Sequence, residues 1–201
     1  MLFFNNINNI KNIFILLFFI TMLNGCTNTD MKSFSNKTPN LDLFNFFKGE
    51  TIAYGIFEDR FGNLRRQFRV NLKGTIKDNK LILDEKFLYD DGEFDTRIWT
   101  IKKDFLTKDN IKYTGSAKDI EGFAKGKATG NTLNWSYEIY LKMKGKNLKV
   151  RFNDWIYQQD DNVAINRAYV SKFGIEIGSV TLVFLRGKAA KTIGPLNLKK
   201  W

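Results

Sequence analysis

Hydrophobic residues alternate with polar ones over most of the chain after residue 50. The alternating runs are short, and clusters of Gly, Asn and Asp separate them. A period of two places successive side chains on opposite faces of a β-strand, so the pattern predicts about ten strands. The expected strands are residues 51–59, 63–73, 80–89, 95–103, 110–117, 120–129, 132–143, 147–157, 163–172 and 179–186.

The connections between these runs are short. A parallel crossover needs about a dozen residues, so strands that are neighbours in sequence should pair antiparallel. A long up-and-down sheet removes its exposed edges when it closes. We therefore predict an all-β fold: a single antiparallel, up-and-down, calycin/lipocalin-like barrel, with a two-sheet β-sandwich as the alternative. The apolar segment 41–48, followed by Gly49, predicts a short N-terminal helix that covers one end of the barrel.

The same alternation places charged side chains on the face that carries the apolar residues. In residues 64–72, for example, Arg66 falls in register with Phe68 and Val70. A polar group buried without a partner costs roughly 2–7 kcal/mol, so these groups must pair, reach water or bind a ligand. The ionisable residues expected inside are Asp59, Arg66, Glu85, Arg97, Asp154 and Arg167, and the aromatic residues expected beside them are Trp99, Trp135, Tyr137 and Tyr169.

Three interpretations of this inner face remain open. The charges form a salt-bridge network that fixes the strand register. Alternatively, they belong to a semi-polar cavity, in which the arginines hold a carboxylate or phosphate headgroup and the aromatic side chains line an apolar pocket. In the third interpretation, Glu85 or Asp154 is a catalytic carboxylate.

One strand is unusually rich in small residues. Gly122, Gly126 and Gly130 recur at every fourth position, with Ala124 and Ala128 between them. Small residues let a sheet bend sharply or let a neighbouring group approach the backbone. We interpret this strand as a corner of the barrel.

The N-terminal region is typical of an exported bacterial lipoprotein. An uninterrupted apolar run, residues 13–23, leads to Leu23-Asn24-Gly25-Cys26. That run suits a signal-peptide core of about 7–15 residues and is too short for a membrane-spanning helix of about 20. We predict that residues 1–25 are a signal peptide, that Cys26 is lipidated and that residues 26–40 are a flexible tether. The residue that follows the cysteine is not aspartate, which favours the outer membrane, facing the periplasm.

Composition narrows the chemistry that the chain can perform. It has 201 residues, one cysteine, no histidine and a formal net charge of +11. An intrachain disulfide, histidine-based triads, His-ligated zinc and histidine general bases are therefore excluded. We expect no cofactor, no metal site and no nucleic-acid partner. The positive charge favours contact with anionic headgroups, or it simply keeps a β-surface soluble.

Ordered motifs along the chain carry a family resemblance. They are Phe46-Phe47-Lys48-Gly49, Gly55-Ile56-Phe57-Glu58-Asp59-Arg60-Phe61-Gly62, Tyr89-Asp90-Asp91-Gly92-Glu93 with Arg97-Ile98-Trp99, Asn153-Asp154-Trp155-Ile156-Tyr157, and Asn166-Arg167-Ala168 with Ser171-Lys172-Phe173-Gly174. Together they resemble the DUF3833 family of proteobacterial lipoproteins. The resemblance covers residues 41–186 and implies an exported, lipidated, β-rich domain without an established activity. Residues 187–201 form a basic C-terminal tail beyond the resemblance.

We therefore expect a lipid-anchored envelope protein, either a non-catalytic binding module for a lipidic or amphipathic ligand or an envelope-accessory module. Two alternatives remain: a carboxylate-dependent barrel enzyme that uses Glu85 or Asp154, and a structural lipoprotein that docks another envelope protein. The expected partners are a membrane, reached through the lipid on Cys26, and a lipidic or anionic small molecule.

Overall fold

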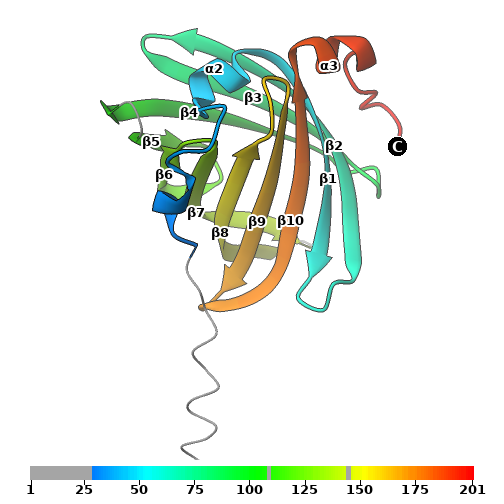
Figure 1. The fold of residues 1–201 in the computed structure, drawn as a ribbon. Helices are drawn as coiled ribbons and strands as arrows, with labels where there is room; N and C mark the ends of the chain where they lie inside the picture. Colours follow the sequence, from blue (N-terminus) through cyan, green and yellow to red (C-terminus); the bar gives the residue numbers. More distant parts are fainter. Residues whose placement is uncertain (1–28, 108–109, 144–145) are drawn as a thin grey trace, which may run out of the picture. The chain divides into compact units, whose positions relative to one another are not determined.

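A computed structural model describes residues 29–107, 110–143 and 146–201 of the chain. Residues 31–201 form a compact unit built on a closed barrel of ten strands, each antiparallel to its neighbours (Figure 1). The strands are β1 (Gly49–Asp59), β2 (Leu64–Lys77), β3 (Lys80–Tyr89), β4 (Phe94–Thr107), β5 (Asn110–Ser116), β6 (Ile120–Thr129), β7 (Thr132–Met143), β8 (Lys146–Gln158), β9 (Val163–Lys172) and β10 (Ile175–Arg186). The predicted signal peptide and Cys26 lie outside the described residues.

The first and last strands close the barrel. Thr51 on β1 lies opposite Leu72 on β2 and also opposite Arg186 on β10. Every strand therefore has a neighbour on both sides, and closure leaves no strand at the edge of the sheet. The prediction of an up-and-down barrel is confirmed, and the β-sandwich alternative is wrong.

A short helix caps one end of this barrel, as the sequence predicted. In α2 (Leu43–Phe47), the N-cap Asp42 accepts a hydrogen bond from the backbone N–H of Phe44 at 2.9 Å. The rings of Phe46 and Phe47 are only 1% and 3% exposed, and they pack edge-on against each other with centroids 5.0 Å apart. We call this region the capped end.

The capped end is dry and tightly packed. Val70, Leu81 and Leu133, which lie on three different strands, are each at most 1% exposed. Gly74 on β2 lies so close to α2 that an added Cβ would stand 1.8 Å from the carbonyl oxygen of Phe47. Only glycine leaves room for the helix at this distance from the strand.

Two glycines make room for one indole ring. Added Cβ atoms at Gly115 and Gly126 would stand 2.6 Å and 2.3 Å from ring atoms of Trp135. Gly126 therefore accommodates a neighbouring side chain. The irregularity of β6 lies upstream of it, where its register with β7 shifts between Glu121 and Lys125.

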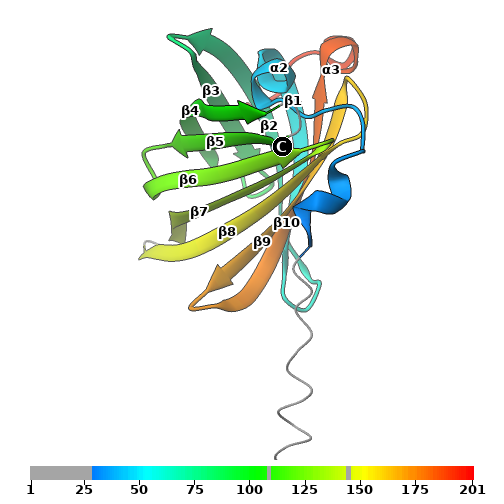
Figure 2. The same cartoon turned by 60° about the vertical axis from the view of Figure 1, so that its left-hand side comes forward.

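Both ends of the described part of the chain pack on the outside of the barrel. The 3-10 helix η1 (Met31–Phe34) places the ring of Phe34 5.9 Å from that of Tyr157, so this part of the expected tether contacts the barrel wall. The expected C-terminal tail begins as a helix, α3 (Gly187–Ile193), after which Asn71 and Leu196 exchange two hydrogen bonds. Figure 2 shows α2 and α3 at one end of the barrel, away from the β1–β2 and β9–β10 turns. No helix within the described residues is long and apolar enough to span a membrane.

Candidate functional site

Five polar side chains gather inside the barrel, and we call them the inner polar cluster. They are Glu85, Arg97, Asp119, Asp154 and Asn166. Four come from the inner faces of β3, β4, β8 and β9, whereas Asp119 lies in the turn between β5 and β6. Glu85 and Arg97 are register partners on neighbouring strands, so their side chains project from the same face of the sheet.

Arg97 is held by Asp119. Its Nε donates a hydrogen bond to Oδ2 of Asp119 at 3.0 Å, and Nη2 lies 2.8 Å from the same oxygen. The Arg97 side chain is 17% exposed, so this charge-assisted pair is partly shielded from water. The guanidinium of Arg97 and the carboxylate of Asp119 therefore each have a charged partner.

The Arg97–Asp119 pair spans a gap in the pairing between β4 and β5. Pairing between β4 and β5 begins at Thr100 and Ser116, so the first part of β4, including Arg97, has no partner on β5. The ion pair replaces the missing backbone ladder there. It links β4 to the β5–β6 turn.

Asp154 and Asn166 form the most buried part of the cluster. The Asn166 amide donates a hydrogen bond to Oδ1 of Asp154 at 2.8 Å, and the two residues are 6% and 5% exposed. Oδ2 of Asp154 and Oδ1 of Asn166 are also buried, and neither accepts a hydrogen bond of normal geometry, although the Tyr137 hydroxyl lies close enough to Asp154 to lower its pKa. Two buried acceptors thus lack a well-aligned donor, and a buried acceptor without any donor costs roughly 1–3 kcal/mol.

Aromatic rings surround these acceptors. Trp99 packs edge-on against Trp135 and Tyr137, with ring centroids 5.7 Å and 5.3 Å apart. Tyr137 in turn stacks on Phe152 at 5.4 Å. The rings form an apolar surface next to the polar side chains, a combination that is usual in small-molecule sites.

The interior is more accessible here than at the capped end. Phe87, Tyr137 and Phe152 face inward, yet they are only partly buried. Glu85 beside them is also partly exposed. Water therefore reaches these side chains, whereas the core residues at the capped end are almost completely buried.

Burial controls the charge of the cluster. It raises the pKa of Glu85 to about 7, although Arg97 and a hydrogen bond from Trp99 act in the opposite direction. It also raises the pKa of Asp154 to about 6, against the effects of its hydrogen bonds from Asn166 and Tyr137. Near neutral pH, Glu85 is therefore partly protonated, and the cluster holds more acceptors than free donors.

Two of the predicted site residues lie outside the barrel. Tyr169 is 41% exposed, and Arg167 points outward, where it donates a hydrogen bond to Thr181 at 2.8 Å. The inner face of β9 carries Ala168 and Asn166 instead. The prediction was wrong because both faces of β9 are apolar enough to be buried, and pairing with its neighbours decides which one turns inward.

Two further predicted residues organise turns at the rim. Asp59 accepts hydrogen bonds from the backbone N–H groups of Phe61 and Asn63. Burial would raise its pKa, but these bonds and those from the Asn63 and Arg65 side chains hold the pKa of Asp59 well below its usual range. Arg66 stacks on the Tyr89 ring at 3.5 Å and pairs with acids of the β3–β4 turn.

The remaining predicted residues lie together inside: Glu85, Arg97, Trp99, Trp135, Tyr137 and Asp154. Their role in ligand binding stays a prediction. Sequence reasoning missed Asn166, which occupies the inner face of β9, and Asp119, which looks like an ordinary turn residue. The motif Asn166-Arg167-Ala168 contains Asn166, but apolar residues on both faces of the strand hide which residue of the motif points inward.

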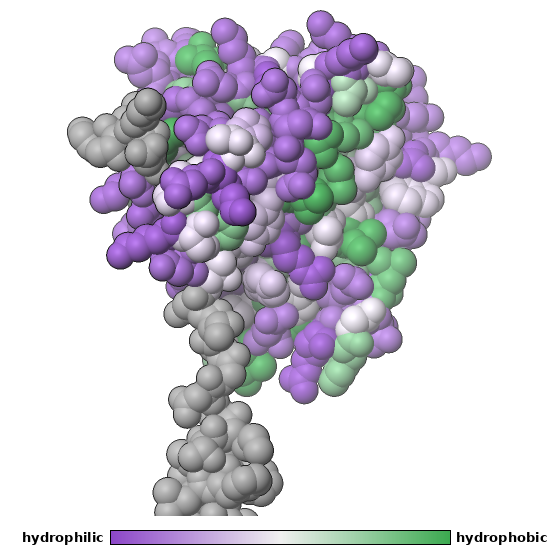
Figure 3. Space-filling view, in the orientation of Figure 1, coloured by the Kyte–Doolittle hydropathy of each residue, from purple (hydrophilic) through white to green (hydrophobic). Residues whose placement is uncertain are grey.

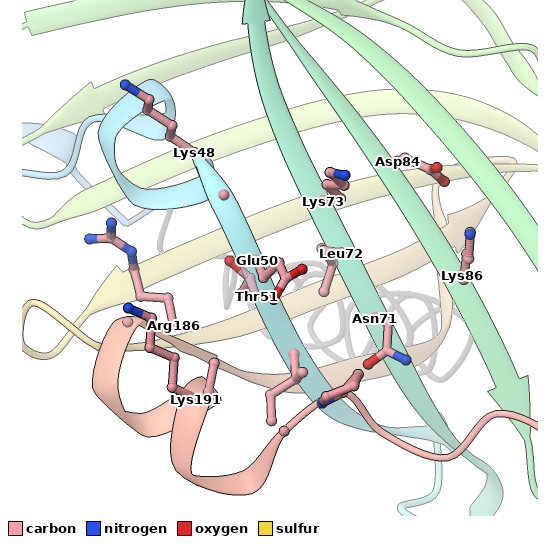
Figure 4. Close-up of a pocket in the computed structure, with 16 residues that line it drawn as sticks. Lys48, Glu50, Thr51, Asn71, Leu72, Lys73, Asp84, Lys86, Arg186 and Lys191 are labelled. Carbon is pink, nitrogen blue, oxygen red and sulfur yellow. The ribbon is translucent and has the colours of Figure 1, made fainter.

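A groove of about 670 Å³ lies on the outer wall between α3 and strands β1 to β3 (Figure 4). Basic side chains prevail in its lining: Lys48, Lys73, Lys86, Arg186 and Lys191 stand against Glu50 and Asp84. The groove is separate from the inner polar cluster because it is bordered by the outward faces of the strands. Within the described part of the chain, no group of three or more acidic or cysteine side chains could hold a metal ion.

The sequence profile of a family described as "Protein of unknown function (DUF3833)" matches residues 20–186. The chain belongs to the DUF3833 family. The match includes Cys26 and ends with β10, so α3 and the last residues lie beyond what this DUF3833 protein shares with the profile. A search of curated proteins found no match.

Among solved structures, this DUF3833 protein is similar to the S-type phycobiliprotein lyase CPES from Guillardia theta. The TM-score is 0.51 at 9% sequence identity, over 72% of this chain and 90% of that chain. At this identity the likeness concerns the fold alone. It agrees with the lipocalin-like barrel expected from the sequence.

Proposed function

We propose that this DUF3833 protein is a non-catalytic binding module whose barrel interior holds a lipidic or amphipathic molecule. One observation carries the proposal: the buried oxygens Oδ2 of Asp154 and Oδ1 of Asn166 have no well-aligned hydrogen-bond donor. A group of this kind is costly to bury, and a ligand that donates hydrogen bonds removes the cost.

The chemistry of the inner polar cluster narrows the ligand class. Arg97 is already paired with Asp119, and Arg66 with Asp91 and Glu93. Among the described inner residues, no arginine remains free to hold a carboxylate or phosphate. A hydroxyl or amine donor next to an apolar body suits the unpaired acceptors and the aromatic wall better than an anion does.

The most direct test is to ask what the protein carries. The full chain, purified from its own membranes in mild detergent, is extracted with organic solvent and analysed by mass spectrometry. We expect one amphipathic species in roughly stoichiometric amount. An extract without any enriched molecule, from protein that also fails the probe test below, would refute the binding module and leave the structural-lipoprotein and enzymatic alternatives.

A pair of fluorescent probes tests the ligand chemistry. N-phenyl-1-naphthylamine is neutral and donates one N–H, whereas its 8-sulfonate carries a negative charge on the same ring system. We expect the neutral amine to bind and the sulfonate to bind at least tenfold more weakly, because the acidic cluster repels it. Tighter binding of the sulfonate would instead support the original anion-site hypothesis.

Matched variants locate the site. Asp154→Leu removes the unpaired acceptor and should weaken binding of the neutral probe by about tenfold, the effect of losing one buried hydrogen bond. Arg167→Ala alters an outward side chain and should leave binding unchanged. Equal effects of both changes would place the probe outside the barrel interior.

A specific observation keeps the enzymatic alternative open. Burial raises the pKa of Glu85 to about 7, the range in which a carboxyl group can both donate and accept a proton. If Glu85 is catalytic, the extracted molecule should be chemically altered after incubation with the protein and unaltered with Glu85→Gln. If it is a binding residue, the molecule should remain unchanged with both.

We also propose that the protein is anchored to the bacterial envelope, at the outer membrane, through lipid on Cys26. The apolar run before this cysteine supports the anchor, and the family match begins upstream of it. Metabolic labelling with a tagged fatty acid should mark the wild type and not Cys26→Ser. Equal labelling of both would refute the anchor without affecting the interior site.

A further inference from the structure

The β9–β10 hairpin displays a phenylalanine at its tip. Lys172 and Ile175 are paired, so Phe173 and Gly174 form a two-residue turn, with φ angles of 51° and 78°. Phe173 is 93% exposed. A left-handed backbone costs a residue with a Cβ roughly 1–2 kcal/mol, and the exposed ring gains nothing from burial in return.

The β2–β3 hairpin shows how such a turn is ordinarily built. Lys77 and Lys80 are paired there, and the two turn residues are Asp78 and Asn79, with φ angles of 49° and 56°. Polar residues of this kind tolerate the left-handed region and suit solvent. The contrast shows that a turn of this type does not require Phe173.

The neighbouring β1–β2 turn adds more exposed apolar surface. Phe61 is 75% exposed, and Ile175 at the start of β10 is 60% exposed. The backbone N–H of Arg60 donates a hydrogen bond to the carbonyl of Ile177 at 3.1 Å, which ties the two hairpins together. We call Arg60, Phe61, Lys172, Phe173 and Ile175 the hairpin tip. Figure 3 shows hydrophobic surface among hydrophilic surface along this lower edge of the barrel.

Each exposed ring of the hairpin tip has a cation beside it. The Arg60 guanidinium lies 4.8 Å from the centroid of Phe61, and the Lys172 ammonium lies 5.3 Å from that of Phe173. Within the described residues, neither cation has an ion-pair partner. Apolar rings with flanking positive charges match the boundary between acyl chains and anionic headgroups.

We infer that the hairpin tip inserts into the surface of an anionic lipid bilayer. This inference uses the proposed anchor on Cys26 but is independent of the interior ligand. The domain begins at Met31, five residues after Cys26, a span of at most roughly 18 Å. A lipid on Cys26 would hold the barrel beside the bilayer, and the hairpin tip is the surface whose rings and charges suit the headgroup region.

The test uses the full, processed chain reconstituted into vesicles of phosphatidylethanolamine and phosphatidylglycerol at 3:1. In Phe173→Cys, a thiol-reactive nitrobenzoxadiazole dye reports on the tip. In the matched control, Asp78→Cys, the same dye sits on the same type of turn between β2 and β3. We expect blue-shifted emission, quenched by lipids with brominated acyl chains, for position 173 alone.

Two outcomes would overturn the inference: unshifted emission at both positions, or an equal or larger shift at position 78. Emission that shifts only after another envelope protein is added would also overturn it, in favour of a protein partner. The number of dye molecules per chain shows separately whether Cys26 is acylated. One dye per chain means that Cys26 is acylated, whereas two mean that it is free, and the difference between the two variants still reports on the tip.

Charge provides a second readout. In the Phe173→Cys background, Lys172→Gln removes one positive charge and should lower the ratio of inserted to free tip roughly fivefold on these vesicles. On vesicles of uncharged phosphatidylcholine, the same change should have no effect. An equal effect on both kinds of vesicle would contradict recognition of anionic headgroups.

Discussion

The capped end and the inner polar cluster occupy the same barrel, but they differ in polarity and in how tightly they are packed. At the capped end, α2 fills the interior with rings that are almost fully buried, such as Phe46 at 1% exposure. Further along, the interior holds ionisable groups whose burial raises the pKa of Glu85 and Asp154. Apolar packing stabilises the fold, whereas the cluster lowers stability and leaves acceptors unpaired. The barrel is therefore stabilised at one end, whereas its more accessible half holds polar groups that the proposed ligand would satisfy.

The largest effect is expected at the capped end. Phe46→Ala should lower the free energy of unfolding by about 4 kcal/mol, because it leaves a cavity under α2. Phe61→Ala, at the exposed hairpin tip, should change it by less than about 0.5 kcal/mol. Urea unfolding followed by tryptophan fluorescence measures both. Similar values for the two variants would mean that the capped end does not carry the core.

A substitution in the inner polar cluster should affect the free energy of unfolding in a pH-dependent way. Unlike Phe46→Ala, it should become more favourable as the pH rises. The folded-state pKa of Asp154 is about 6, above its ordinary value of 3.8, so the protonated form favours folding. That contribution is present below pH 3.8 and is lost as the pH rises through about 6. Asp154→Asn stays neutral, so its stability relative to wild type should rise by about 2.5 kcal/mol between pH 4 and pH 8. Urea titrations across this range check it, and a constant difference would contradict it.

A further prediction concerns Gly126, which contacts the ring of Trp135. Gly126→Ala pushes a methyl group against the indole and should cost about 2 kcal/mol of unfolding free energy. Lys125→Ala, the exposed neighbour on β6, should be close to neutral. The near-UV circular dichroism of Gly126→Ala should also change, because Trp135 packs against Trp99. An unchanged spectrum and stability would show that the ring moves freely.

The smallest expected effect is a gain in the free energy of unfolding. Phe173→Asn places a residue that tolerates a left-handed backbone in the β9–β10 turn and should raise the unfolding free energy by about 1 kcal/mol. Asp78→Asn, in the equivalent β2–β3 turn, should change little. Differential scanning calorimetry can resolve the two variants. A loss of stability in Phe173→Asn would mean that the Phe173 ring makes stabilising contacts in the folded state.

The alternation of side chains was enough to predict the fold and part of the site. The strand from residue 147 to 157 has one clearly apolar face, and Asp154 lies on it, so its inward position could be predicted. The strand from 163 to 172 has apolar residues on both faces. Its orientation could not be predicted, and the inward residue proved to be Asn166 rather than Arg167.

Other features depend on contacts between residues that are far apart in the chain. Nothing local distinguishes Asp119 from a solvated turn aspartate, yet it pairs with Arg97, 22 residues earlier. The expected C-terminal tail carries no pattern that indicates α3, or the hydrogen bonds between Asn71 and Leu196. Likewise, Gly126 suggests a bend in the sequence, and only the fold shows that it accommodates the Trp135 ring.

The sequence by itself determined the strands, the antiparallel order and the capping helix, because hydrophobic period, turn residues and short connections act locally along the chain. The tertiary structure decided which charges share the interior, which of them pair and which acceptors remain without a donor. Those outcomes depend on strand register and barrel closure, which bring together residues that no local pattern relates.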